Sequence, residues 1–255
     1  MSWEEQKKKF EDQRKKYGEI YYPKREVSNK NSKGLTHIIG SYYSPKMDEQ
    51  ISFESLNELD VYILLEMSSV VWGYYPQPEK VHVQVYGKMG ELKTFPHYPD
   101  VLVCAEESKP CLYQIKGDYT DSENTPQNIR LKQATMDYAR ENGWNYKVIH
   151  THNLSEDFRW NVKFIFPFLK KERANTEYSD AIFAYLNKHP IATIDELANL
   201  AVKNVAREYV LPVIYHEIAN GLLYIDLSRR IDGKSKIRLA QEDDVDYYQY
   251  IWELE

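Results

Sequence analysis

The sequence PDVLVCA at residues 99–105, followed closely by CLYQIK at residues 111–116, decides the fold that we expect. Both stretches are short and rich in apolar residues, which is typical of neighbouring strands in a sheet. Asp100 stands at the start of the first strand. Gln114 and Lys116 are two positions apart on the second strand, so they point to the same face. If the two strands pair, these three side chains converge at one edge of the sheet.

The segments around these strands predict further helices and strands. From Glu54 to Ser69, apolar residues recur at helical spacing, and Ser52 precedes the run as a candidate cap. We predict helices over Glu54–Ser69 and Gln127–Glu141, and strands over Lys80–Tyr86, Phe95–Ala105, Cys111–Ile115 and Tyr146–His150. The order of helix, three strands, helix and strand indicates a mixed α/β core.

The C-terminal part of the chain predicts a smaller domain of three helices and a β-hairpin. Thr193 and Glu196 fit a capping box, Gly221 follows the third helix at the usual stop position, and Asp232-Gly233 is a hairpin signal. We predict helices over Glu177–Lys188, Ile194–Val202 and Pro212–Asn220, and strands over Leu222–Leu227 and Lys236–Ala240. This order describes a winged helix. A further aromatic-rich helix, Asp157–Leu169, is expected to pack on the α/β core.

These patterns divide the chain into four parts, and the formal net charge of −6 is unevenly spread over them. Residues 1–33 hold ten Lys and Arg against six acids, whereas residues 241–255 hold six acids and no base. The overall acidity therefore argues only weakly against a nucleic-acid ligand. We expect a basic arm at 1–34, an α/β domain at 35–170, a winged helix at 171–245 and an acidic tail at 246–255.

The sequence also bears on the compartment. No apolar run is long enough to span a bilayer, and the charged segment Met1–Phe10 lacks the apolar core of a secretory signal. Cys104 and Cys111 are too few for a disulfide scaffold, so we expect two buried free thiols. We therefore expect a cytoplasmic protein without a membrane partner.

The residues at the predicted sheet edge suit metal-dependent phosphodiester hydrolysis, which needs an activated water and stabilisation of negative charge. Asp100 and Glu58 offer carboxylate oxygens and Gln114 an amide oxygen, all suited to Mg²⁺, with Mn²⁺ as a substitute. Lys116, beside carboxylates, is expected to stay protonated and to neutralise developing charge. Glu54, one helical turn from Glu58, is the alternative ligand. The competing interpretation is that Asp100 only forms a turn and Lys116 is only a surface charge.

Taken together, these residues resemble the TnsA family of transposon endonucleases, whose catalytic domain has the restriction-endonuclease-like PD-(D/E)xK fold. The similarity runs from Gly40 to His150. It is carried by the segments Phe53–Asp60, Gln77-Pro78, His97–Asp100 and Tyr113–Lys116. Most nucleases of this fold carry Glu or Asp where this chain has Gln114, whereas the transposon enzyme can carry Gln.

The resemblance implies an active site made of Glu58, Asp100, Gln114 and Lys116, the first three being metal ligands. It implies cleavage of the 5′, non-transferred strand in the double-stranded DNA of transposon ends during cut-and-paste transposition. A transposase of the retroviral-integrase type would cut and join the other strand, and an ATP-dependent regulator would couple the pair to a target. The C-terminal winged helix is similar to the family's second domain.

Six further side chains are candidates for contacts with nucleic acid. One lies close before Asp100, two lie early in the helix that follows the metal strand, and three lie at the hairpin tip. His97 could instead simply line the site, and for Arg130 and Lys132 a solvated helix face is the competing interpretation. They are His97, Arg130, Lys132, Arg229, Arg230 and Lys234. Residues 175–240 hold eight bases and eight acids, so we favour protein docking for the winged helix, with the hairpin tip as a phosphate contact.

Two other functions fit the same sequence. The first is a stand-alone nuclease of phage, defence or repair type with the same fold, which would cut DNA without a partner. The second is a DNA-bridging or adaptor protein whose nuclease fold has lost its activity. Gln114 favours this last alternative, because an amide in place of a carboxylate weakens metal binding.

Overall fold

The computed structural model describes residues 3–25, 38–86, 90–117, 125–169, 176–241, 243–252 and 254. The chain folds into two compact units. The first unit comprises Met1–Leu65, Val70–Asn153 and Ile251–Glu255, and the second comprises Glu66–Ser69 and Leu154–Tyr250. Each unit contains its own β-sheet structure.

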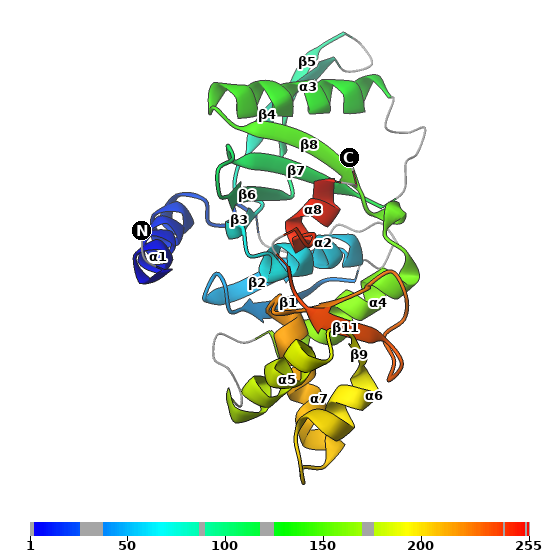
Figure 1. Ribbon diagram of the computed structural model, residues 1–255. Coiled ribbons are helices and arrows are strands. Elements are labelled where there is room, and N and C mark those ends of the chain that lie inside the picture. Colours follow the sequence, from blue (N-terminus) through cyan, green and yellow to red (C-terminus); the bar gives the residue numbers. More distant parts are fainter. Residues whose placement is uncertain are drawn as a thin grey trace. The chain divides into compact units, whose positions relative to one another are not determined.

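The first unit is a mixed α/β fold built on a four-stranded sheet in the order β3-β6-β7-β8. β3 (Val71–Pro76), β6 (Val101–Ala105) and β7 (Cys111–Lys116) are antiparallel neighbours, and β8 (Asn145–His150) runs parallel to β7. The helix α3 (Pro126–Glu141) connects β7 to β8. It flanks the sheet together with α2 (Leu56–Met67), as Figure 1 shows. A mixed sheet flanked by helices was predicted, and this coarse class is confirmed.

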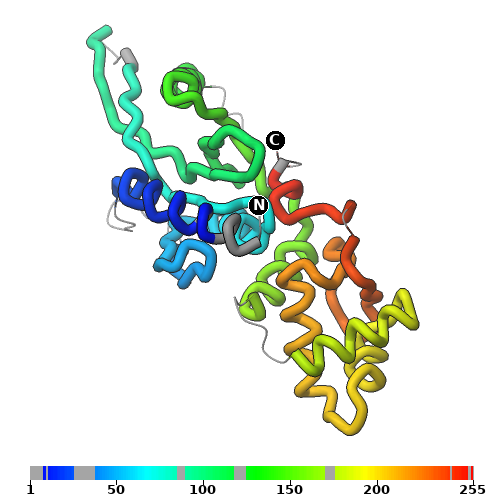
Figure 2. Tube along the Cα trace, turned by 60° about the vertical axis from the view of Figure 1, so that its left-hand side comes forward, coloured from blue at the N-terminus to red at the C-terminus, as the bar shows by residue number. Residues whose placement is uncertain are grey.

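Two antiparallel hairpins lie outside this sheet. β1 (Gly40–Ser44) pairs with β2 (Glu49–Phe53), and β4 (Val81–Tyr86) pairs with β5 (Leu92–His97). The β4–β5 hairpin projects from the sheet in Figure 2 and packs on α3 through β4. The predicted single strand Phe95–Ala105 is therefore wrong, because it is divided between β5 and β6.

The basic N-terminal arm contains an 18-residue helix, α1 (Trp3–Ile20), which packs on the first unit through aromatic side chains. The Tyr17 ring lies 5.2 Å from Trp72 in an edge-on arrangement, and the Tyr21 ring lies 5.4 Å from Trp144. Edge-to-face pairs of aromatic rings contribute more stability than the burial of their apolar surface alone would give. One face of this polar helix is therefore held to the sheet.

The start of α2 differs from the prediction. Glu54 lies two residues before the helix, which begins at Leu56. Ser55 is the capping residue, since its Oγ accepts a hydrogen bond from the Glu58 amide at 3.1 Å. The predicted cap, Ser52, lies instead in β2, where it pairs with Ser41.

The second unit contains helices followed by a small antiparallel sheet in the order β10-β11-β9. Its elements are α4 (Glu156–Ile165), the 3₁₀ turn η3 (Phe166–Phe168), α5 (Thr176–Lys188), β9 (Ala192–Thr193), α6 (Ile194–Glu196), the π-helical turn η4 (Leu197–Ala201), α7 (Arg207–Ala219), β10 (Leu223–Ile225) and β11 (Lys236–Leu239). The Thr193–Glu196 capping box is present. Gly221 ends α7 with a φ of +70°, in the left-handed region that glycine favours. The predicted helices and hairpin strands are thus found, with shifted ends.

Two details of this unit were not predicted. α7 begins at Arg207, five residues before Pro212, which lies inside the helix. The hairpin turn at Gly233 packs closely on Asp195, whose carboxylate fills the place that a Cβ would occupy. Any larger residue at position 233 would therefore displace the backbone or the carboxylate.

By its contacts the main segment of the second unit begins at Leu154, whereas the sequence pattern predicts the end of the α/β domain at residue 170. The side chain of Asn161 in α4 explains the difference. Its Nδ2 donates to the carbonyl oxygens of Leu227 and Arg229 at 2.8 and 2.7 Å, and its Oδ1 accepts from the Ile231 amide at 2.9 Å. These hydrogen bonds tie α4 to the β10–β11 loop.

The region predicted as an acidic tail, 246–255, contains a helix, α8 (Tyr247–Trp252). Tyr248, Ile251 and Leu254 are buried. In the second unit, the Asp246 carboxylate accepts hydrogen bonds from the Ser68 hydroxyl at 2.6 Å and from the Ser69 amide at 2.8 Å. The region predicted as an acidic tail therefore contains a helix with buried side chains and a hydrogen-bonded acid.

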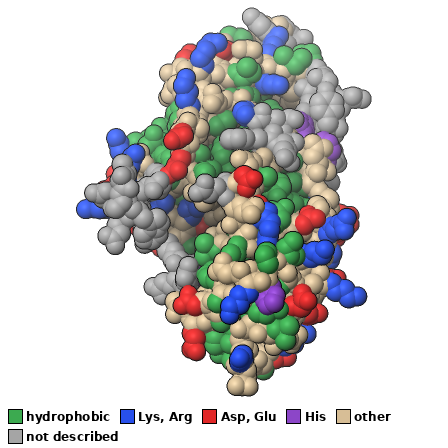
Figure 3. Space-filling view, in the orientation of Figure 1, with side chains coloured by type: hydrophobic (Ala, Val, Ile, Leu, Met, Phe, Trp, Pro, Cys, Tyr) green, Lys and Arg blue, Asp and Glu red, His purple; other side chains and the backbone are tan. Residues whose placement is uncertain are grey.

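Three general features of the described residues bear on function. No helix among them is long and apolar enough to cross a membrane. Cys104 and Cys111 are free and buried, as predicted. On the face drawn in Figure 3, basic and acidic side chains are interspersed over the lower half, which is consistent with the balanced charge of residues 175–240.

Candidate active site

The backbone of Asp100 is fixed where β5 ends and β6 begins. Its amide donates to the Tyr113 carbonyl at 3.1 Å, which joins it to β7. Its carbonyl accepts from the Gln77 amide at 2.9 Å and from the Tyr62 hydroxyl at 3.1 Å. The break between the two strands thus holds Asp100 in contact with α2, with β7 and with the residue that follows β3.

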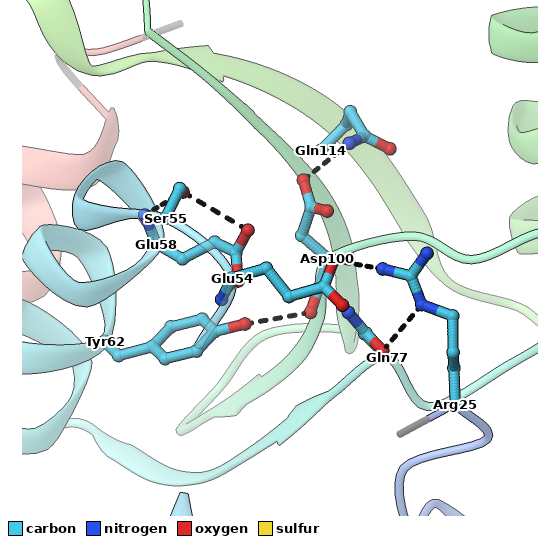
Figure 4. Close-up of polar contacts among 8 residues, drawn as sticks. All are labelled: Arg25, Glu54, Ser55, Glu58, Tyr62, Gln77, Asp100 and Gln114. Atoms are coloured by element: carbon cyan, nitrogen blue, oxygen red, sulfur yellow. Dashed lines mark hydrogen bonds and ion pairs between the residues drawn. The ribbon is translucent and has the colours of Figure 1, made fainter. Parts of the chain in front are cut away.

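The side chains of Asp100 and Gln114 meet, as the pairing of their strands predicts. Asp100 Oδ2 accepts hydrogen bonds from Gln114 Nε2 and from the Ile115 amide, both at 2.5 Å. The amide nitrogen of Gln114 therefore faces the carboxylate, and its oxygen points away, as Figure 4 shows. Gln114 Oε1 is buried, and the Gln114 side chain acts on His97, whose pKa it raises against the larger, opposite effect of burial.

Glu58 is the third predicted ligand, and its carboxylate is engaged at the start of α2. Glu58 Oε2 accepts from the Glu54 amide at 2.9 Å, and Oε1 accepts from the Ser55 hydroxyl at 3.2 Å. Glu58 is only 9% exposed. The same carboxylate thus both caps the helix and faces the acidic cluster around Asp100 (Figure 4).

The electrostatics of Asp100 oppose its ionisation. Burial, and next the neighbouring Glu58, raise the pKa of Asp100 to about 8, although the Ile115 amide and Lys116 act in the opposite direction. Burial also raises the pKa of Glu58, and Glu54 adds to that rise. Carboxyl groups with raised pKa values in close proximity are a common feature of functional sites.

Lys116 and His97 lie close enough to this cluster to affect its charges. Lys116 is exposed at the end of β7, and its ammonium lowers the pKa of Asp100. Burial lowers the pKa of His97 to about 4, with Lys116 as the next largest cause. His97 is therefore a neutral imidazole at pH 7.

Three residues of the site were not predicted as functional, namely Arg25, Gln77 and Tyr62. Arg25 forms an ion pair with Glu54 and donates from Nε to Gln77 Oε1 at 3.4 Å (Figure 4). Gln77 is buried and adopts a φ of +44°, a conformation that non-glycine residues rarely adopt. Gln77 belongs to one of the segments that carry the family resemblance, but its contacts and those of Arg25 were not predicted, because their partners lie far away in the sequence.

The remaining predicted contacts lie on other elements than the residues of the cluster, and three of them belong to the second unit. Arg130 and Lys132 are exposed on α3, and Arg229 and Lys234 are exposed in the β10–β11 loop. Arg230 in the same loop is held by α4, since its guanidinium carbon lies 3.5 Å from the centre of the Trp160 ring. The cluster itself is formed by Glu54, Glu58, Asp100, Gln114 and Lys116, with His97 beside it.

Comparison of the chain with protein-family models and with the sequences of curated proteins gives no match. The function of the chain is therefore inferred from the geometry of this cluster and from the sequence motifs.

Proposed function

We propose that the first unit is the catalytic domain of a metal-dependent DNA endonuclease with a restriction-endonuclease-like fold. The order α2, β3, β6, β7, α3, β8 supports this, with three antiparallel strands followed by a helix and a parallel strand. Glu58 on the helix, Asp100 before the second of these strands and Lys116 at the end of the third follow the PD-(D/E)xK order. The contact between Asp100 and Gln114 is the observation that carries the proposal.

The donor atoms of the cluster fit a divalent cation such as Mg²⁺ or Mn²⁺. Glu58, Asp100 and Gln114 would hold it, because carboxylate and amide oxygens are the ligands that such ions prefer. A cation would favour the ionised form of both carboxylates, whose pKa values are raised without one. Turning the Gln114 amide group over would bring its buried Oε1 to the cation as a ligand.

The proposed chemistry is hydrolysis of a phosphodiester bond. The bound cation would supply charge neutralisation and an activated water. Asp100 is positioned for its part by the Ile115 amide and by three backbone hydrogen bonds. The Lys116 ammonium, exposed beside Asp100, would stabilise negative charge on the phosphate. His97, neutral at pH 7, would line the site.

The second unit supports a narrower proposal, an endonuclease of the TnsA type. Helices α5, α6 with η4, and α7 precede the β10–β11 hairpin, and β9 adds a third strand, which is the order of a winged helix. With the sequence resemblance, this favours cleavage of the 5′, non-transferred strand at transposon ends. The partners would be an integrase-type transposase and an ATP-dependent regulator.

One observation favours a second function, that of an adaptor without nuclease activity. Gln114 presents Nε2, a donor, to the Asp100 carboxylate, and this hydrogen bond stabilises the site without a metal. In that case the acidic cluster would serve the fold alone.

Cleavage by site variants tests the proposal. Asp100→Ala and Lys116→Ala are each expected to lower Mg²⁺-dependent cleavage of transposon-end DNA by about 100-fold or more, because the first removes a proposed metal ligand and the second removes the cation proposed to stabilise the phosphate. The assay contains the chain with and without a transposase, and activity without one would indicate a stand-alone nuclease.

Asp180→Ala and Lys93→Ala, which change exposed residues away from the cluster, are matched controls and should cleave normally. Normal cleavage by Asp100→Ala would refute the site. A wild-type chain that never cuts, even with a transposase, would favour the adaptor.

A further inference from the structure

Arg25 is a cation at the acidic cluster that the catalytic proposal does not use. Its guanidinium forms the ion pair with Glu54, and Nε contacts Gln77 (Figure 4). Among the described residues, Nη1 has no hydrogen-bond partner, and 45% of the side chain is exposed. A guanidinium has five N–H donors, so this geometry leaves donors directed to solvent.

The backbone around Arg25 is connected to Asp100 through one residue. The Lys24 amide donates to the Gln77 carbonyl at 3.1 Å, and the Gln77 amide donates to the Asp100 carbonyl at 2.9 Å. Gln77 is 4% exposed, so this bridge lies inside the protein. These two hydrogen bonds connect the backbone next to Arg25, through Gln77, to the backbone of Asp100.

Electrostatics also place Arg25 within range of the cluster. Its charge lowers the pKa of Glu58 and that of His97. An open groove beside it is lined by Lys24, Arg25, Gln50 and Gln77, together with Glu49 and neighbouring residues. Arg25 and Lys116 thus both act on the charges of the cluster, and Arg25 comes from a segment before the sequence motif that contains Lys116.

We propose that Arg25 binds a backbone phosphate of the DNA substrate next to the bond that is cut. The planar guanidinium suits two-pronged contact with phosphate oxygens, and its pairing with Glu54 and Gln77 holds it in place beforehand. A cation held by the carboxylates would offset the negative charge of Glu54, Glu58 and Asp100, so that Arg25 and Lys116 would face the phosphate backbone with a net positive field. The inference depends on the proposed nuclease function, and it adds a substrate-binding residue to it.

DNA binding as a function of salt tests this role without cleavage. The probe is a 20-base-pair duplex of arbitrary sequence with Ca²⁺ in place of Mg²⁺, and the duplex is checked for intactness after each measurement. Each phosphate contact contributes about 0.9 to the slope of log affinity against log salt concentration. Arg25→Gln is expected to weaken binding about fivefold to tenfold and to lower the slope by about one.

Arg140→Gln is the matched control, because it removes the same group from an exposed arginine that is likewise paired with an acid. Arg140 Nη2 donates to Asp137 Oδ1 at 2.7 Å on α3, and Arg140 is not among the residues that line the groove. It should leave the slope unchanged. Arg25→Lys keeps the charge without the planar group and should retain the slope while recovering only part of the affinity. Circular dichroism confirms that each variant is folded.

The outcomes separate this inference from the nuclease proposal. If the wild type binds and cuts DNA while Arg25→Gln keeps the full slope, the role of Arg25 is refuted and the nuclease proposal stands. An equal loss in Arg140→Gln would indicate a diffuse basic surface and would also refute it. If the wild type neither binds nor cuts DNA, both proposals fail.

Discussion

Asn161 in the second unit and Asp100 in the first both join distant segments, but they differ in charge and surroundings. Asn161 is fully buried, and its amide gives two hydrogen bonds and accepts one, all with backbone groups. The Asp100 carboxylate accepts two hydrogen bonds, while burial and next Glu58 raise its pKa and so oppose its ionisation. A neutral group with matched partners stabilises a fold. An acid held beside another acid destabilises it, and such sites are candidates for function.

The largest effect on stability is expected at Asn161. Asn161→Ala leaves the carbonyls of Leu227 and Arg229 and the amide of Ile231 without their partner. Since each unsatisfied buried polar group is unfavourable by about 1–3 kcal/mol, we expect a loss of about 3 kcal/mol in the free energy of unfolding. Urea unfolding monitored by circular dichroism measures it. Asn199→Ala, which removes one exposed amide contact, is the control, and equal losses in the two variants would contradict the structural role of Asn161.

Asp100→Asn is expected to raise the free energy of unfolding, in contrast to Asn161→Ala. The amide oxygen still accepts from Gln114 and Ile115, but the buried charge is absent. Without divalent cations, the variant should be more stable than the wild type at pH 8 by about 1–3 kcal/mol. Thermal and urea unfolding in the presence of a chelator measure the difference, with Asp180→Asn as the exposed control.

The raised pKa of Asp100 explains why Asp100→Asn should be the more stable protein at pH 8. The folded protein keeps the Asp100 proton up to a pKa of about 8, whereas the unfolded chain loses it near the ordinary value of 3.8. Asp100 therefore contributes stability at low pH, and this contribution is lost as the pH rises from about 4 to 8. The variant should lack that slope, so the difference should shrink towards pH 4. If the wild type were more stable than Asp100→Asn at pH 8, ionisation of the Asp100 carboxylate would not destabilise the folded state.

The two regions also differ in how far sequence alone predicts them. The second unit is marked by local signals: the Thr193–Glu196 box, Gly221 and the Asp232-Gly233 turn all act within a few residues. Its helices and hairpin were predicted for that reason. The start of this unit at Leu154 was not predicted, because Asn161 contacts residues 66 to 70 positions later.

In the first unit, β7 and β8 were predicted by their apolar pattern, and β6 was predicted as the second half of one longer strand, which was enough to bring Asp100 next to Gln114. β3 was missed because almost all of its residues are buried, so that no alternation marks it. Arg25 and Gln77 were missed because their contacts with Glu54 and Asp100 link residues 23 to 29 positions apart. A single sequence carries no signal for such pairs.

The smallest predicted effect tests which serine caps α2, where sequence and structure disagree. Ser55→Ala should lower the free energy of unfolding by about 1 kcal/mol, because it removes the capping oxygen. Ser52→Ala, at the position that the sequence favours, should change it by less than about 0.5 kcal/mol. Urea unfolding of the two variants compares them directly, and a larger loss for Ser52→Ala would restore the sequence-based assignment.

Ser55 also contacts Glu58, an acid of the first unit with a raised pKa. Its hydroxyl donates to Glu58 Oε1 and lowers the pKa of that acid, against the effect of burial. Removing the hydroxyl should therefore raise the pKa of Glu58 further, so that ionising it destabilises the folded state more. Ser55→Ala should accordingly lose more stability at pH 8 than at pH 4. A loss that is the same at both values would mean that Ser55 serves the helix alone and that Glu58 is not held against its charge.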